Sequence, residues 1–162
     1  MRRLFFSTVI GLCFGLLLPA LSHANGPVWE LYTNWAKVGI SPEGHEHWVA
    51  RDSVMAAPQE PHMVSFYLKV HFANEQQEMG RIYDTEIADM VMDCSHGRMD
   101  TLTVYRYFQG IPADNIRFHK ERSVKVKLDT LSEQELRMVC GKNLPRFVAE
   151  KDRVKERGAI LH

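Results

Sequence analysis

Apolar and polar residues alternate between Met63 and Phe72. Successive side chains of a β-strand point to opposite faces, so a period of two predicts a strand with one buried face and one wetter face. Such a strand is typical of an antiparallel sheet that is covered on one side. The apolar positions are Val64, Phe66, Leu68, Val70 and Phe72, and the intervening ones are Ser65, Tyr67, Lys69 and His71.

Weaker strand patterns lie on both sides of this segment. Apolar, aromatic and β-branched residues predict strands at 28–35, 48–51, 81–94, 98–108 and 124–129. We interpret 39–47 as a loop, 73–80 as a hairpin connection and 94–97 as a turn. The apolar set of the 81–94 strand changes face near Ile87 and Ala88, which predicts a β-bulge there.

The period changes to that of a helix at Leu131. Leu136, Val139 and Cys140 are spaced to share one helical face. Ser132 and Glu135 have the spacing of a capping box. Gly141 is suited to a helix end, and Pro145 excludes continuation. The predicted fold class is α+β: a curved antiparallel sheet of about five to six strands with a C-terminal helix.

The first residues have the pattern of a secretory signal peptide. Two arginines precede an apolar run from Leu4 to Leu18, and small residues precede Asn25, so we place cleavage after Ala24. The run is shorter than the roughly 20 residues that span a bilayer. Leu12 before Cys13 disfavours lipoprotein processing. We therefore expect a signal peptide at 1–24, a domain at 25–142 and a charged tail at 143–162, which is either a fraying helix or a docking arm.

Cleavage changes the charge balance. Removing 24 of the 162 residues leaves 138, with 18 of the 20 basic residues against 20 acidic ones, a formal charge of −2. A chain without a basic field gives no electrostatic case for nucleic-acid binding. No second apolar run is long enough to span a membrane, so we expect no membrane span after cleavage.

Cys94 and Cys140 are the two cysteines of the mature chain. Export places them in an oxidising compartment, which predicts a disulfide. A metal site and a redox pair are the alternatives, but the chain has no CxxC motif. On the chain-entropy estimate, a bridge between positions this far apart stabilises by about 4 kcal/mol.

Few residues point to catalysis or to a cofactor. The chain has no GxSxG motif and no glycine-rich phosphate loop, so we expect no enzymatic activity and no cofactor. His45 and His47 are weak candidates for half of a metal site, which needs three or four ligands. His62, His71, His96 and His119 are available as further ligands, among seven histidines on the mature chain.

Tyrosines and cations on the predicted strands are the candidates for binding. Tyr and Arg are enriched at binding hot spots, and an uncovered sheet face would present such groups together. In the alternative interpretation they only cover the sheet. Open sheet edges also favour pairing with a second copy, so a homodimer is a candidate assembly. The candidate residues are Tyr67, Lys69, His71, Tyr105 and Tyr107, with Arg106 between the last two.

Several of these features occur in the same order in one known family. They are Trp29, the segment 48–54, the Asp93-Cys94 pair, Tyr105 and Tyr107 before Gly110, and Val139-Cys140. With them, residues 27–142 resemble the surface-adhesin protein E-like family of Gram-negative bacteria. The resemblance implies an antiparallel sheet, a C-terminal helix whose cysteine closes the disulfide, and binding of host matrix or serum proteins at the bacterial surface.

These observations favour an exported, non-enzymatic binding protein. It would reside in the periplasm, at the cell surface or in the medium, with a host extracellular protein or an envelope protein as its partner. The first alternative is a periplasmic accessory protein of an envelope complex, for which the charged tail is the docking element. The second alternative is a histidine-based metal-binding protein.

Overall fold

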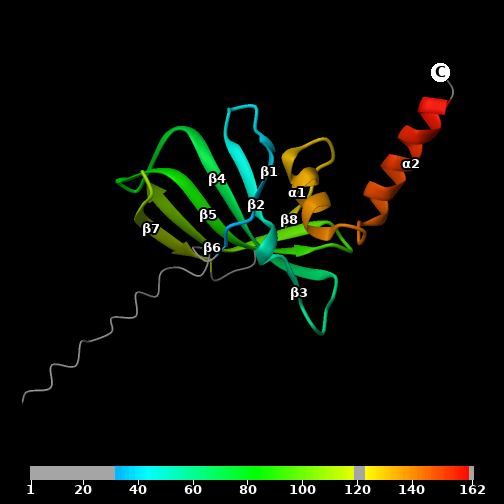
Figure 1. Ribbon diagram of the computed structural model, residues 1–162, viewed down its shortest axis with the longest axis horizontal. Helices are drawn as coiled ribbons and strands as arrows, with labels where there is room; N and C mark the ends of the chain where they lie inside the picture. Colours follow the sequence, from blue (N-terminus) through cyan, green and yellow to red (C-terminus); the bar gives the residue numbers. More distant parts are fainter. Residues whose placement is uncertain (1–31, 119–122, 161–162) are drawn as a thin grey trace, which may run out of the picture.

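The structure is a computed structural model that describes residues 32–118 and 123–160. The predicted signal peptide, the first part of the predicted strand 28–35 and His119 lie outside these residues. An antiparallel sheet and two C-terminal helices make up the described chain (Figure 1). The strands are β1 (Trp35–Ile40), β2 (Glu46–Ala50), β3 (Met55–Ala56), β4 (Met63–Glu78), β5 (Arg81–Asp93), β6 (Arg98–Phe108), β7 (Ile111–Arg117) and β8 (Val124–Lys125). The helices are the short 3₁₀ helix η2 (Arg51–Ser53), α1 (Leu131–Cys140) and α2 (Arg146–Ile160).

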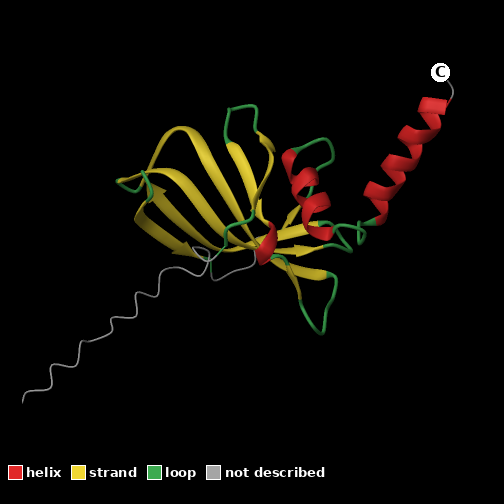
Figure 2. Cartoon of the chain, viewed as in Figure 1, coloured by secondary structure: helices red, strands yellow, loops and turns green. Residues whose placement is uncertain are grey.

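Six strands form the main path of the sheet, in the order β1-β2-β4-β5-β6-β7. Every neighbouring pair is antiparallel, and the two short strands β3 and β8 extend the sheet beside one end of β4 and of β6. The long strands bend together, so the sheet is curved (Figure 2). The predicted α+β class, with a curved antiparallel sheet and a C-terminal helix, is confirmed.

The alternating pattern in β4 separates two faces as predicted. Val64, Phe66 and Leu68 are buried, and they share one apolar cluster with the inner face of α1. Leu136, Val139 and Cys140 are the buried apolar residues of that helix, which confirms the predicted helical face. We call this side of the sheet the helix-covered face.

A disulfide joins α1 to the end of β5. Cys94 directly follows β5, Cys140 is the last residue of α1, and their Cα atoms are 5.6 Å apart. Both residues are buried in the main core cluster. The predicted pairing is therefore confirmed, and it holds the C-terminal end of α1 against the sheet.

The predicted bulge at Ile87 and Ala88 is wrong. These residues pair with Lys69 and Leu68 in unbroken register. Both are buried because each face of the sheet has its own apolar cluster at this point. The irregularity lies further along, between β5 and β6, where Leu102 has no partner between the Asp89–Thr103 and Met90–Thr101 pairs.

Several strands differ from the prediction, among them the predicted strand 124–129, of which only β8 forms. β1 begins at Trp35 and runs into the predicted loop, because backbone pairing with β2 continues to Ile40. β4 extends to Glu78, so the hairpin connection is only the turn at Met79 and Gly80. β7 was not predicted, since its proline and polar side chains look like a loop in the sequence.

The start of α1 also differs. Thr130 is the N-cap, and the predicted capping box of Ser132 and Glu135 is wrong. The carboxylate that reaches back is that of Glu133, which accepts a hydrogen bond from the Asp129 N–H at 2.7 Å. Glu135 points the other way, into the interior, and contacts His47 on β2.

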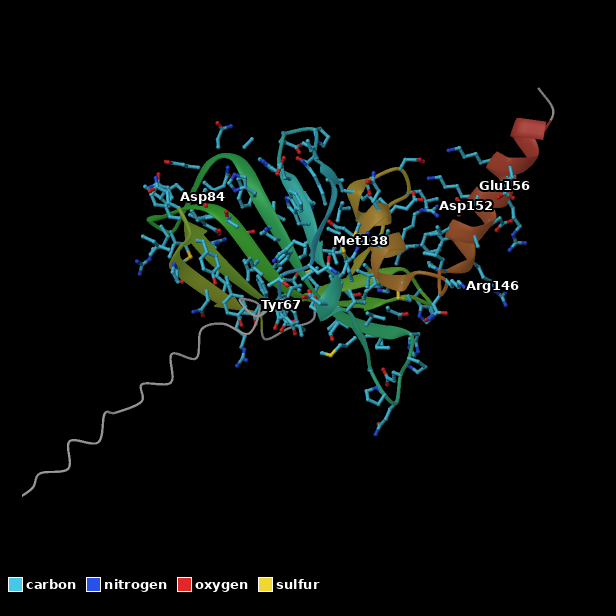
Figure 3. All side chains as sticks on the ribbon, in the orientation of Figure 1. Tyr67, Asp84, Met138, Arg146, Asp152 and Glu156 are labelled. Atoms are coloured by element: carbon cyan, nitrogen blue, oxygen red, sulfur yellow. A yellow bond between two sulfur atoms is a disulfide. The ribbon has the colours of Figure 1, made fainter. Side chains whose placement is uncertain are left out.

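The first two turns of α2 are attached to the rest of the protein. Val148 is fully buried in the main core, and Phe147 packs so closely over Gly97 that a Cβ there would lie 2.5 Å from the ring. Asp152 forms an ion pair with Arg137 of α1. Beyond these contacts the helix extends away from the sheet, with Glu156 farther out than Asp152 (Figure 3). The predicted tail thus contains a docked part and a projecting part.

Glu133 lies at the centre of this attachment. It accepts hydrogen bonds from Arg137 and from Lys151, and its side chain is 7% exposed. Burial alone raises the pKa of Glu133, but the bonds from Lys151, the Asp129 amide and Arg137 outweigh burial and hold the pKa at about 2. The carboxylate therefore stabilises the folded state while it is ionised.

We expect the contribution of Glu133 to disappear in acid. Because its folded pKa lies below the ordinary value of 4.5, the stabilisation is present above pH 4.5 and is lost as the pH falls towards 2. In urea unfolding at pH 6, Glu133→Gln should cost on the order of 2 kcal/mol, because the partly exposed partners weaken the ion pairs. The difference from wild type should shrink at pH 3. Glu150→Gln, at an exposed position of α2, is the control. If Glu133→Gln lowers the free energy of unfolding equally at pH 3 and pH 6, the stabilising role of the Glu133 carboxylate is contradicted.

Candidate functional site

A row of side chains crosses the sheet on the face opposite to α1. Directly opposed residues of antiparallel strands point to the same side, so the strand register alone places the row on one face. It consists of Lys37, Trp48, Lys69, Ile87, Tyr105 and Asn115, one residue from each strand of the main path. The neighbouring positions on the same face add further aromatic rings from β1, β4 and β6. We call Trp35, Trp48, Tyr67, Lys69, Tyr105 and Tyr107 together the aromatic face.

Lys69 lies between the two tryptophans of this face. Its Nζ is 4.6 Å from the ring centroid of Trp35 and 5.4 Å from that of Trp48. Both distances are within the range of cation–π attraction. Lys37 approaches Trp48 from the other side, at 5.4 Å, but it is also ion-paired with Glu46. Within residues 32–118 and 123–160, Lys69 forms no ion pair.

The charges on this face are partly desolvated. Burial lowers the pKa of the Lys69 ammonium, and nearby Glu46 opposes that shift. Burial raises the pKa of the Asp89 carboxyl, which Arg117 opposes. Burial likewise raises the pKa of the Tyr67 phenol, and the charge of Asp89 adds to the rise. A ligand that pairs with Lys69 or Asp89 would therefore find charges already removed in part from water.

A hollow of about 290 Å³ lies in the aromatic face beside Lys69. Its wall includes Trp35, Tyr107 and the hydroxyl-bearing Thr85, and Tyr32 lies at its edge. The Trp35 Nε1–H donates to the Tyr32 carbonyl at 3.1 Å. The next two backbone N–H groups, of Thr33 and Asn34, donate to the Asp52 carboxylate of η2. Local hydrogen bonds thus hold this wall of the hollow in place.

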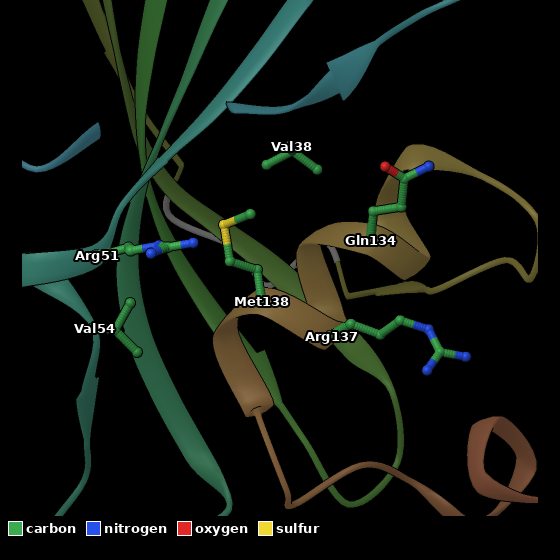
Figure 4. Close-up of a pocket in the computed structure, with 6 residues that line it drawn as sticks. All are labelled: Val38, Arg51, Val54, Gln134, Arg137 and Met138. Carbon is green, nitrogen blue, oxygen red and sulfur yellow. The ribbon is translucent and has the colours of Figure 1, made fainter. Parts of the chain in front are cut away.

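A larger groove, of about 660 Å³, lies on the opposite side beside α1 (Figure 4). Val38, Val54 and Met138 give it an apolar floor, and Arg51 points into it. Its second arginine, Arg137, turns towards α2 and is bonded to Glu133 and Asp152. We place the candidate site on the aromatic face because its rings and charges converge, whereas the groove presents one exposed guanidinium.

All five predicted binding residues lie on the same side of the sheet. Tyr67, Lys69 and His71 alternate along β4, and Tyr105 and Tyr107 alternate along β6. His71 is at the rim, where its Nδ1 is 3.1 Å from the Thr85 hydroxyl. The sequence alone left open whether the two groups share a face, and the strand register places them on the same one. Whether these residues bind a partner stays a prediction.

Arg106, between the two tyrosines, points to the helix-covered side. It is buried there, stacks on the Tyr83 ring at 4.3 Å and is ion-paired with Glu78 and Glu86. Hydrogen bonds to Glu86 and Glu78 outweigh burial and raise the pKa of Arg106. Its role is therefore structural at the far end of the sheet, and it is not part of the aromatic face.

The histidines do not converge. The Nδ1 of His47 is 2.9 Å from buried Glu135, while the Nδ1 of His45 accepts from the Ala73 N–H. Among the described side chains, no three His, Cys, Asp or Glu are grouped as a metal site would require. His96 has Ser95 and Asp93 on the same nitrogen, at 2.8 and 2.7 Å, whereas a catalytic relay uses both ring nitrogens.

Sequence reasoning missed the two tryptophans and Tyr32 as members of the site. Trp35 stood at the end of a predicted strand and Trp48 at the start of another, so neither was assigned to a face. The available signal was the alternation along β2, which places Trp48 on the same face as Glu46 and Ala50. Only the pairing of Trp48 with Lys69 shows that the indole and the ammonium meet.

The fold is shared with solved structures of one protein. No protein-family model and no curated protein matches the sequence. The structure resembles Haemophilus influenzae protein E in crystal form II, with 14% identity and a TM-score of 0.53 over 73% of this chain and 95% of that one. Protein E from non-typeable Haemophilus influenzae gives 13% identity and 0.52 over 82% and 95%. A selenomethionine form gives 16% and 0.53 over 68% and 88%.

These identities are low, so the likeness concerns the path of the backbone. It agrees with the resemblance drawn from Trp48, the Asp93-Cys94 pair and Cys140, and it spans most of the described domain. In the described ranges, no helix is long and apolar enough to cross a bilayer. In this chain a disulfide-tethered helix covers one face of the sheet, and aromatic side chains lie on the other. The backbone that carries them has a protein E-like fold.

Proposed function

We propose that this is an exported, non-enzymatic binding protein that captures an extracellular host protein through the aromatic face. The observation that carries the proposal is the convergence of Trp35 and Trp48 on Lys69, with Tyr67 in the same aromatic cluster as Trp35. Tryptophan and tyrosine supply much of the binding energy at protein surfaces. The protein E-like fold and the family resemblance support a role as an adhesin.

The division of the sheet supports a binding role for this face in particular. α1 and the start of α2 contribute to the core of the helix-covered face, where Leu136 and Val148 are fully buried. Tyr107 is buried, but the other four rings of the aromatic face remain part-exposed, although they are large and would be buried readily in a core. A face that combines partly exposed rings with partly desolvated charges favours recognition.

Replacing Trp35 by alanine should weaken capture of a host protein by about tenfold or more. The substitution removes one wall of the hollow and one of the two rings that hold Lys69, which is typical of a hot-spot loss. The measurement is surface plasmon resonance of residues 25–162 against immobilised matrix and serum proteins. Val154→Ala removes an exposed apolar side chain from α2 and is the control. If both variants lose the same affinity for host proteins, or if neither loses any, the aromatic face is not the binding surface.

Protease accessibility on intact cells tests where the domain resides. If the domain is displayed outside, added protease digests it while a periplasmic protein stays intact. If the domain is protected until the outer membrane is opened, host-protein capture is contradicted and the partner must be sought in the envelope.

The periplasmic accessory role is the second candidate, favoured by the projecting part of α2. Deleting the whole tail would remove buried Val148 and confound the test. Deleting residues 153–162 instead keeps the Arg137–Asp152 pair. Loss of co-purification with an envelope partner in this deletion, with unchanged thermal stability, would support the accessory role. Retention of every partner would argue against it.

A further inference from the structure

We propose that the hollow beside Lys69 is a subsite for an acidic sugar, one that carries a carboxylate at the end of a host glycan. The inference rests on the proposed function and specifies its ligand: the host protein is recognised through its glycan. Four features of the hollow suit such a ligand: its charge, the rings around it, its size and the polar groups on its wall.

The charge at the hollow is a cation without a carboxylate partner in the described chain. Lys37 is neutralised by Glu46, whereas the contacts of the Lys69 ammonium are the faces of Trp35 and Trp48. These rings and the sheet beneath them remove part of its water, and an opposite charge gains more where the dielectric constant is low. The charge complementarity of the hollow therefore calls for an anion.

The surroundings of Lys69 suit a sugar ring. The negative π-faces of Trp35 and Tyr107 attract groups with positive edges, such as the C–H groups on one face of a pyranose. Thr85 lines the hollow, and its hydroxyl donates to Asp84 at 2.8 Å and lies 3.1 Å from the His71 Nδ1, so it can still accept a hydrogen bond from a sugar hydroxyl. The volume of about 290 Å³ is at the lower end of ligand pockets, which suits a single ring.

A protein side chain fits this hollow less well than a sugar. The cores of protein interfaces are depleted of Lys and Asp, because burial between two flat surfaces strips both of water. Here Lys69 and Asp89 lie on neighbouring strands in the middle of the face. A glycan carries hydroxyls that satisfy such charges and leaves part of the surface hydrated, so it avoids that desolvation cost.

The test is a titration of the mature protein with sialyllactose and with lactose, followed by saturation-transfer NMR and calorimetry. We expect sialyllactose to bind at least tenfold more tightly than lactose. Lys69→Met keeps the apolar stem and removes the charge, so it should abolish that preference. Lys142→Met removes an exposed lysine from the α1–α2 link and should leave it unchanged. Circular dichroism checks that each variant is folded.

The inference is overturned if the two sugars bind alike, or if neither binds at millimolar concentration. It is also overturned if an acidic peptide competes for Lys69 while sialyllactose does not, since the partner group is then a protein carboxylate. The proposed function fails separately: it falls if Trp35→Ala leaves host-protein capture unchanged. If enzymatically deglycosylated host protein is still captured through Trp35, the sugar inference fails and the proposed function stands.

Discussion

Removing the disulfide should lower the free energy of unfolding by about 4 kcal/mol, from the cost of closing a loop of this length. That is a large share of the roughly 5–15 kcal/mol that holds a typical domain together. The bridge joins positions separated by 46 residues and fixes the end of α1 on the sheet. The paired substitutions Cys94→Ala and Cys140→Ala avoid leaving a free thiol or a buried hydroxyl. Urea unfolding followed by circular dichroism measures the loss.

Reduction provides the matched control for this experiment. Wild type with a reductant should unfold at nearly the midpoint of the double variant, while the double variant should not respond to the reductant. Cys140→Ser alone should also be strongly destabilised. If the unfolding midpoint of the double variant equals that of oxidised wild type, the bridge contributes nothing to stability and the loop-entropy argument is wrong.

Neighbouring residues on β4 should give opposite results. Phe66 is 1% exposed beneath α1, whereas Tyr67 is part-exposed on the aromatic face and packs on Tyr32 at 5.3 Å. Phe66→Ala should cost about 3–5 kcal/mol, because it removes a large side chain and leaves a cavity that rigid strands fill poorly. Tyr67→Ala should cost roughly 1 kcal/mol, since less area is lost.

Binding should show the reverse order. Tyr67→Ala should reduce host-protein capture several-fold, and Phe66→Ala should leave it unchanged at temperatures where that variant is folded. Denaturant unfolding and surface plasmon resonance of both variants make the comparison. A large stability loss in Tyr67→Ala without a binding defect would mean that the aromatic face is a second core and not a recognition surface.

The parts of the fold that sequence predicted are those that depend on local periodicity. Alternation from Val64 to Leu68 specified the buried side of β4, and the spacing of Leu136 and Cys140 specified the inner side of α1. The even number of cysteines in a chain predicted to be exported specified the bridge. Each of these signals is contained in one segment or follows from composition, so no knowledge of pairing was needed.

The parts that sequence did not predict depend on contacts between segments. β7 contains Pro112, and only its pairing with β6 makes it a strand. Glu135 has capping-box spacing, but a tertiary contact with His47 takes its carboxylate. Only part of the site was predicted, for the same reason. Alternation along the strands identifies the tyrosines and Lys69, whereas the position of Trp35 beside Lys69 depends on the register of three strands.

The separation of the two faces has an evolutionary consequence. Since the larger core cluster is on one side of β4 and the part-exposed rings are on the other, substitutions can accumulate at those ring positions at little risk to folding. Lineages that inherit this backbone can therefore diverge in what they recognise faster than they diverge in shape. Selection for a new ligand, in nature or in a display library, would best begin at positions 35, 67, 69 and 105.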